Sequence, residues 1–394
     1  MRKSTKWKET IKAVLLYPFI LNKVKSIDSN IIFFFPRYQT GGAERVHINI
    51  IRSVSAEKPT CIITDLSDDK DFKKEFAQFA RLIYLHRWGW KTSFRKIMAR
   101  KIAKQINKIQ NPVIFGSNSE LFYDLFPHLG ENCVKIDLLH TDLSHLPLSI
   151  ENYASVYTHE LTHRILLGEG HKLKLQNFYT GKGISLEEMS KLKIIPNGIR
   201  VPKSFREKEY VDDLLVLFVA RNGYEKRPEL FLKIASESGT LNLPYKFVMI
   251  GDFDCFQSEK PSNIDIVGKI TDKNLLNQYY QKAHFIFVTS LFEGFPMVLL
   301  EGMSYGVIPI STDVGEIRFD VNEEKETGFI VPNDPDPMKI VERFIEKMAY
   351  LASNRRSLSR ISLNCYDLVK SKFDETIFNK DYKKLLTNTK NGER

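Results

Sequence analysis

Two glutamates in "LFEGFPMVLLEGMSYG" (residues 291–306) are the first side chains in this sequence that could do chemistry. Glu293 lies shortly before Pro296, and Glu301 interrupts a run that is otherwise apolar. A carboxylate in an apolar setting normally has a partner, because an unpaired buried charge is costly or takes up a proton. Pro296 suits the first turn of a helix, where its missing N–H is harmless. We therefore expect a strand-to-helix turn, with Glu301 accepting hydrogen bonds from neutral donors such as sugar hydroxyls.

A pair of cations precedes these carboxylates in "FVARNGYEKRPEL" (218–230). Arg221 follows an apolar run, and Lys226 lies five residues later in a loop that leads into a helix. Arginine offers a fork of donors and lysine a compact charge, so the two together suit a diphosphate. A solvated loop is the alternative interpretation of the same residues.

The glycine pair in "PRYQTGGAERV" (36–46) lies between a predicted strand and a predicted helix. Gly41 and Gly42 would let the backbone approach a ligand closely, and a helix start offers free N–H groups to an anion. A simple turn is the alternative. The pattern is not G-x-G-x-x-G, which disfavours a nicotinamide-dependent enzyme.

Alternating strands and helices must position these residues. Short apolar runs alternate with helical stretches from Asn30 onward, which predicts parallel sheets covered on both faces. The first set of predicted strands covers 31–35, 60–66, 81–86, 112–117, 134–140, 154–159 and 192–198. The second set covers 214–221, 245–252, 264–270, 284–290, 307–312 and 327–332.

The chain of 394 residues, 43% of them hydrophobic, is long enough for two packed domains. We expect the α/β class with two tandem, doubly wound, Rossmann-like domains, and a ligand site in a cleft beyond the carboxyl ends of their strands. The predicted parts are a basic N-terminal extension (1–29), a first Rossmann-like domain (30–200), a second one (201–370), and a C-terminal helix (371–394) that could pack back on the first domain.

The motifs, taken in order, resemble the retaining glycosyltransferases of family 4, which have the GT-B fold. The resemblance covers residues 31–345 and rests on "GGAER", "IIPNGI", "VARNGYEK", "EGFPMVLLEGMSYGVIPISTDVGEI" and "TGFIVPNDPDP". It implies an enzyme that moves a sugar, with retention of anomeric configuration, from a nucleotide-diphosphate donor to a saccharide or lipid-linked acceptor. It also implies that the first domain binds the acceptor and the second the nucleotide sugar. The implied role is in polysaccharide, lipopolysaccharide or capsule biosynthesis, with no metal and no other cofactor.

The resemblance assigns roles to four catalytic residues. Arg221 and Lys226 would hold the donor diphosphate, and Glu293 would contact the donor sugar. His140, at the end of "KIDLLH", would lie next to that sugar, although His145 competes for the role.

The resemblance further implies a set of donor-binding residues. Glu301 would bind the ribose hydroxyls, the glycine loop would face the phosphates, and the turn 267–270 would contact the base. The full set is Gly41, Gly42, Glu301, Gly294, Phe295, Pro296, Met297, Val298, Gly268, Lys269 and Asn197.

Three residues depart from the family pattern. Ala220 replaces the usual glycine before the arginine, Arg227 replaces the glycine after the lysine, and Glu316 stands where a second glycine is common. We expect the first two changes to be mild. Glu316 could alter the donor pocket, so the nucleotide and the sugar stay open.

The net charge is unevenly distributed. Residues 1–200 carry +12 and residues 201–394 carry −2, so the first half should face a phosphate-bearing substrate, an anionic membrane or a nucleic acid. Within it, residues 81–108 contain nine Lys or Arg and no Asp or Glu. A predicted helix there would present a basic face beside two tryptophans. The membrane or acceptor candidates are Trp88, Trp90, Lys96, Arg100, Lys104 and Lys108.

This basic segment suits docking on anionic headgroups. The alternative is a helix that packs on the core with one face and exposes a solvated basic face. The two interpretations are compatible. No apolar run reaches the ~20 residues of a membrane span. The run 13–21 is broken by Pro18, and we interpret it as a surface anchor or a packed extension. We therefore expect a peripheral enzyme on the cytoplasmic face of the inner membrane.

Three other functions fit part of the sequence. A nucleotide-sugar epimerase has the same fold, a nucleic-acid-binding protein could use the basic helix, and an inactive relative could serve in assembly. The cleft motifs favour the transferase, with a nucleotide sugar, an acceptor and an anionic membrane as partners and no nucleic acid.

Overall fold

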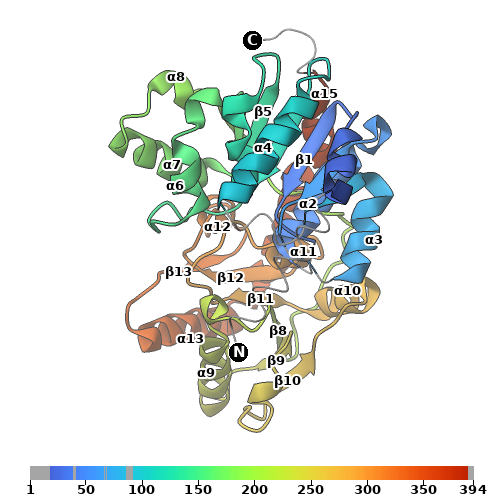
Figure 1. Ribbon diagram of the computed structural model, residues 1–394. Helices are drawn as coiled ribbons and strands as arrows, with labels where there is room; N and C mark the ends of the chain where they lie inside the picture. The colour runs from blue at the N-terminus through green and yellow to red at the C-terminus, as the bar shows by residue number, and fades with distance from the viewer. Residues whose placement is uncertain (1–17, 39–40, 66, 68, 86–91, 389–394) are drawn as a thin grey trace, which may run out of the picture. The chain divides into compact units, whose positions relative to one another are not determined.

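The computed structural model describes residues 18–38, 41–65, 67, 69–85 and 92–388. The chain forms two compact units (Figure 1). The first runs to Pro196 and takes up the chain again from Phe378, and the second comprises Asn197–Ile377.

The first unit contains a sheet of seven parallel strands in the order β3-β2-β1-β4-β5-β6-β7. Its strands are β1 (Ile31–Phe35), β2 (Thr60–Ile63), β3 (Arg81–Tyr84), β4 (Val113–Ser117), β5 (Val134–Leu138), β6 (His163–Leu166) and β7 (Leu192–Ile194). Its helices are α2 (Gly42–Ser53), α3 (Lys70–Phe79), α4 (Thr92–Ile106), α5 (Glu120–Asp124), α6 (Ile150–Ser155), α7 (Glu169–Gly181), α8 (Leu186–Met189) and α15 (Glu375–Thr387).

Described segments from both halves of the chain, residues 18–25 and α15, pack into this unit. Residues 18–25 are helical, and Ile20 and Val24 are buried in the same apolar cluster as strands β1 and β4. In α15 the ring of Tyr382 is fully buried and lies 6.0 Å from that of Phe115.

The strand expected at 154–159 is wrong. Residues 150–155 form α6, because Ser149 caps the helix by accepting from the N–H of Asn152, and Tyr153 and Tyr157 then point the same way. Their rings lie 6.1 and 5.8 Å from the ring of Tyr123. A spacing of four residues on one packed face is helical.

The sixth strand lies instead at His163–Leu166 and contains a fully buried arginine. Arg164 lies opposite Asp137 of β5 and donates to both of its carboxylate oxygens, at 3.0 and 2.9 Å. The hydroxyl of Tyr123 donates to the same carboxylate at 2.7 Å. A buried charge is tolerated when it is paired and hydrogen-bonded in this way. Because Arg164 interrupts the apolar run, the sequence pattern did not predict a strand at β6.

The second unit has six parallel strands in the order β10-β9-β8-β11-β12-β13, and all six expected strands of this half are confirmed. They are β8 (Leu214–Val219), β9 (Tyr245–Ile250), β10 (Ile264–Gly268), β11 (Phe285–Val288), β12 (Ile308–Thr312) and β13 (Phe329–Val331). Its helices are α9 (Pro228–Thr240), α10 (Lys273–Lys282), α11 (Met297–Met303), α12 (Ile317–Asp320), α13 (Pro337–Ser353) and α14 (Leu358–Lys372).

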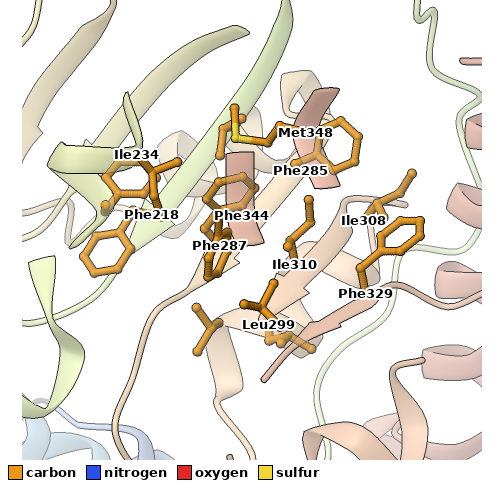
Figure 2. Close-up of a cluster of buried hydrophobic side chains, with 14 of the residues drawn as sticks. Phe218, Ile234, Phe285, Phe287, Leu299, Ile308, Ile310, Phe329, Phe344 and Met348 are labelled. Carbon is orange, nitrogen blue, oxygen red and sulfur yellow. The ribbon is translucent and has the colours of Figure 1, made fainter. Parts of the chain in front are cut away.

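The core of this unit explains why the short helix α11 stays in place (Figure 2). Phe287 of β11 packs on Phe344 of α13 with ring centroids 5.1 Å apart, and Leu299 of α11 is fully buried in the same cluster. Burying a side chain of this size contributes about 1.5–3 kcal/mol. The apolar residues around Glu301 therefore hold the helix that carries it.

The structure thus has the expected α/β class, with two parallel sheets in tandem. Among the described residues, no helix combines the length and the apolar character that crossing a bilayer requires.

Candidate functional site

The carboxyl ends of β8 and β11 bring together two residues that the sequence singled out. β8 and β11 are neighbours at the point where the strand order of the second sheet reverses. Lys226 ends a short 3₁₀ turn after β8 (Tyr224–Lys226), and Glu293 lies in the loop between β11 and α11. The Nζ of Lys226 lies 2.5 Å from Oε1 of Glu293. The side chains are only 19% and 12% exposed, so this ion pair is largely shielded from water.

Ser290 adds a second donor to this carboxylate. Its hydroxyl donates to the same Oε1 of Glu293 at 2.7 Å. Two donors on one oxygen fix the orientation of the carboxylate. Ser290 escaped the sequence analysis, although its place directly after a buried strand is a usable signal.

Arg221 shares the loop with Lys226 but has a different partner. Its guanidinium lies 3.7 Å from the carboxylate of Glu225 and is 68% exposed. An exposed pair of this kind is weak, typically worth about 0–1 kcal/mol. Arg221 can therefore exchange this partner for another anion at little cost.

The turn into α11 differs slightly from expectation. Pro296 is the N-cap residue and α11 begins at Met297, one residue later than a proline in the first turn would give. Phe295 is buried against Phe373, with ring centroids 5.1 Å apart. Gly294, Met297 and Val298 complete the loop and first turn. These expected donor-binding residues are therefore continuous with Glu293.

Glu301 has a partner within the protein. The hydroxyl of Tyr280, on α10, donates to its Oε2 at 3.1 Å. Burial, followed by the negative charge of Glu301, raises the pKa of Tyr280 well above its ordinary value, so the hydroxyl keeps its proton. Tyr280 is fully buried, and its ring stacks on that of Tyr305. The sequence analysis did not identify this tyrosine.

The loop after β12 packs directly on the Glu293 loop. The N–H of Glu316 donates to the carbonyl of Gly294 at 2.9 Å. Gly315 has φ +57°, and a Cβ there would lie 2.2 Å from the same carbonyl oxygen, so only glycine fits. Glu316 itself is buried. The departure from the family pattern therefore lies beside Glu293.

Three further donor-binding candidates belong to this unit, namely Gly268, Lys269 and Asn197. Gly268 is the last residue of β10, the edge strand of the sheet, and Lys269 follows it. Asn197 is 4% exposed, and its side-chain oxygen has no hydrogen-bond partner among the described residues. Such buried, unpaired acceptors are rare and leave a position for a ligand donor.

In the first unit, the partly exposed His140 lies beside two buried histidines, His47 and His171. Its Nε2 is 2.9 Å from Nε2 of His47 on α2, and the His47 ring stacks on Phe35 at 4.0 Å. Burial, followed by the neighbouring His171, lowers the pKa of His140 to about 4. His145 is exposed and lies outside this group. The sequence analysis missed His47 and His171.

The glycine pair lies at the start of α2, with Gly41 as the N-cap residue and Gly42 the first helical residue. The same helix carries His47, so the glycine pair and one histidine of the group share an element. Among the described residues, no group of three or more His, Cys, Asp or Glu side chains is placed to hold a metal ion.

Residues 92–108 of the basic segment form α4 and the turn that follows it. One face is buried against β1 and β4 through Met98, Ile102 and Ile106. Ile97 of the same helix is 45% exposed. The exposed cations are Lys96, Arg100, Lys101, Lys104 and Lys108. Trp88 and Trp90 lie outside the described residues.

Comparison with known proteins places this geometry in context. Residues 201–362, most of the second unit, match the family model Glycosyl transferases group 1. The chain is 24% identical over 323 residues to the GalNAc-alpha-(1->4)-GalNAc-alpha-(1->3)-diNAcBac-PP-undecaprenol alpha-1,4-N-acetyl-D-galactosaminyltransferase of Campylobacter jejuni, covering 78% of this chain and 85% of that protein.

Solved structures share the fold across both units. Anabaena Alr3699/HepE in complex with UDP superposes with a TM-score of 0.72 at 14% identity, covering 91% of this chain and 99% of that one. The apo form of the lipopolysaccharide outer core galactosyltransferase WaaB has a TM-score of 0.68 at 16% identity, with the same coverage.

The buried histidines predict an acid-sensitive fold. The pKa of His140 and that of His171 both fall from 6.5 to about 4, in each case mainly through burial. Between pH 6.5 and about pH 4 these histidines are protonated in the unfolded chain but neutral in the folded chain. The free energy of unfolding therefore falls as the pH is lowered through this range. We expect the melting temperature to drop from pH 7.5 to pH 5, and to drop less in His171→Gln. The exposed His145→Gln serves as control, and equal drops in all three proteins would contradict the prediction.

Proposed function

We propose the reaction and partners of this chain from its match to the group 1 glycosyltransferases, enzymes that transfer sugars from nucleotide-sugar donors. It moves a sugar from a nucleoside-diphosphate donor to a saccharide or lipid-linked acceptor, with retention of anomeric configuration, in the synthesis of a cell-envelope glycan. The observation that carries the proposal is the ion pair of Lys226 and Glu293 at the switch point of the second sheet.

The cations of this site would act on the leaving group. As the bond to the anomeric carbon breaks, negative charge grows on the departing diphosphate. A cation that is already in place stabilises this charge more in the transition state than in the ground state. Lys226 is shielded and fixed by Glu293, while Arg221 is exposed and weakly paired. We assign both to the diphosphate.

The carboxylates would hold the sugar and the nucleoside. Glu293 is oriented by Ser290 and Lys226, so its second oxygen can accept from a donor-sugar hydroxyl. Glu301 is oriented by Tyr280 and would accept from the ribose hydroxyls. Orienting reacting groups before the reaction lowers its entropic cost.

Retention can arise by two routes. A double displacement needs a carboxylate nucleophile beneath the sugar together with an acid–base partner. The motifs supply no obvious nucleophile, so we favour attack on the same face, assisted by the leaving phosphate.

The relatives suggest which substrates to test. The Campylobacter jejuni relative acts on an undecaprenol-linked glycan, and the Anabaena structure contains UDP. We therefore propose a UDP-sugar as donor and a lipid-linked saccharide as acceptor. The exposed cations of α4 would bring the enzyme to the anionic cytoplasmic face of the membrane, where such an acceptor is found.

A lysine variant tests the diphosphate assignment. We expect Lys226→Ala to lower turnover at least about a hundredfold, since losing one such preorganised donor typically costs roughly 3–4 kcal/mol of barrier. Turnover is measured as transfer or donor hydrolysis with the UDP-sugar that most raises the melting temperature. Lys233→Ala, an exposed lysine on α9, is the control. Near-normal turnover in Lys226→Ala would contradict the assignment.

The two glutamates should separate binding from chemistry. Glu301→Ala is expected to weaken nucleotide binding, because it removes the acceptor for the ribose hydroxyls. Glu293→Ala should lower transfer more than nucleotide affinity. Calorimetry with UDP and steady-state kinetics measure the two effects, and the reverse pattern would argue against these roles.

Charge reversal on α4 tests the membrane partner. Binding to vesicles that contain phosphatidylglycerol should fall about a hundredfold when Lys96, Arg100 and Lys104 become glutamate, given ~1 kcal/mol per basic residue. The matched control reverses three exposed lysines of α3, namely Lys70, Lys73 and Lys74. Binding should also weaken with salt. Equal loss in both triple variants, or indifference to anionic lipid, would exclude a specific role for this face.

A further inference from the structure

Arg227, which follows Lys226, has a backbone conformation that favours glycine. Its φ is +49° and its ψ +57°, in the left-handed region that side chains with a Cβ seldom adopt. The side chain is only 7% exposed. The chain thus keeps a strained backbone and a buried charge at one position, so the arginine side chain must contribute something that glycine would not.

The guanidinium of Arg227 links the ends of neighbouring strands. Its Nε donates to the carbonyl of Thr289 at 2.5 Å, and its NH2 group donates to the carbonyl of Ser290 at 2.9 Å. Both residues directly follow β11. The NH2 group also donates to the side-chain oxygen of Asn333, after β13, at 2.8 Å. Asn333 in turn donates to the carbonyl of Asp313, after β12, at 3.1 Å.

The contacts between the two loops run in both directions. The hydroxyl of Thr289 donates to the carbonyls of Lys226 and Arg227, at 2.8 and 3.1 Å. The N–H of Leu291 donates to the carbonyl of Glu225 at 2.8 Å. The loop that carries Lys226 is therefore tied to the segment that leads to Glu293.

All three side-chain contacts of Arg227 are to uncharged acceptors. Burial lowers the pKa of Arg227 from its ordinary value, an effect partly offset by Glu229, and an arginine stays protonated at neutral pH. A lysine could not reproduce the arrangement, because its single ammonium lacks the planar fork that reaches separate carbonyls.

We propose that Arg227 is a positioning residue, which holds Lys226 against Glu293 by tying the loop after β8 to the ends of β11, β12 and β13. The inference rests on the proposed function, since it gives Arg227 a role in placing the cation that meets the donor diphosphate. Where the family pattern has a flexible glycine, this chain has an arginine whose side chain hydrogen-bonds to the ends of the neighbouring strands; we call this set of hydrogen bonds the clamp.

Glycine at this position gives the direct test. Arg227→Gly removes the clamp and relieves the backbone, so the fold should survive while Lys226 loses its fixed position. We expect turnover per competent site to fall at least about tenfold, as misplacement of a reacting group predicts. Arg227→Lys should be intermediate. The control is Asn242→Gly, an exposed residue of the same unit with φ +51°, which should keep wild-type turnover.

Counting the sites separates positioning from folding. Each protein is titrated by calorimetry with whichever of UDP, GDP, ADP and dTDP most stabilises the wild type. Protein lost to misfolding lowers the stoichiometry, whereas a mispositioned lysine lowers kcat per site. In a Lys226→Ala background, Arg227→Gly should lower kcat less than about threefold, because residues that act through one another are not additive.

Wild-type turnover per site in Arg227→Gly would overturn the inference. So would an equal fold-loss in both backgrounds, which would mean that Arg227 acts independently of Lys226. A wild-type protein that binds none of the four nucleotides and turns over no nucleotide sugar would overturn the proposed function, and the inference with it. These failures are distinguishable because the first two require an active wild type.

Discussion

Every strand pairing in the two sheets of the described residues is parallel, and this constraint determines where the chemistry can lie. Parallel strands place all their carboxyl ends at one edge, and the switch in strand order leaves room for a ligand there. Lys226 and Glu293 are 67 positions apart in the sequence, yet they follow adjacent strands and meet at 2.5 Å. The apolar core under α11 then keeps Glu301 on the same segment.

Burying a charge at the edge of a sheet is costly, and the partly buried carboxylates of this site have hydrogen-bond or ion-pair partners within the protein. Glu293 has Lys226 and Ser290, and Glu301 has Tyr280, whereas Arg221 is exposed and only weakly paired with Glu225. A donor bound as proposed would exchange partners with these groups, which would offset part of its affinity. The benefit is that the groups are oriented before the donor arrives, which favours the transition state.

Much of the fold follows from local patterns. The six strands of the second unit are continuous apolar runs, because both faces of a parallel sheet are covered, and all six were predicted. In the first unit the pattern misled at 154–159, where the end of α6, a turn and the start of a 3₁₀ helix lie, and at β6, where Arg164 interrupts the apolar run. A buried arginine is tolerated in this strand because Asp137 of the neighbouring strand pairs with it. The sequence alone does not predict that contact.

The sequence by itself determined the α/β class, the family and the candidate residues, since strand runs, helix starts and the spacing of Glu293 and Glu301 are local properties of the chain. The tertiary structure alone decided which candidates touch. It paired Lys226 rather than Arg221 with Glu293, gave Glu301 to Tyr280, placed His140 against His47, and turned Arg227 from an expected mild replacement into a buried clamp. The physical reason is that each of these contacts joins segments far apart in sequence, and their distances depend on strand order and packing.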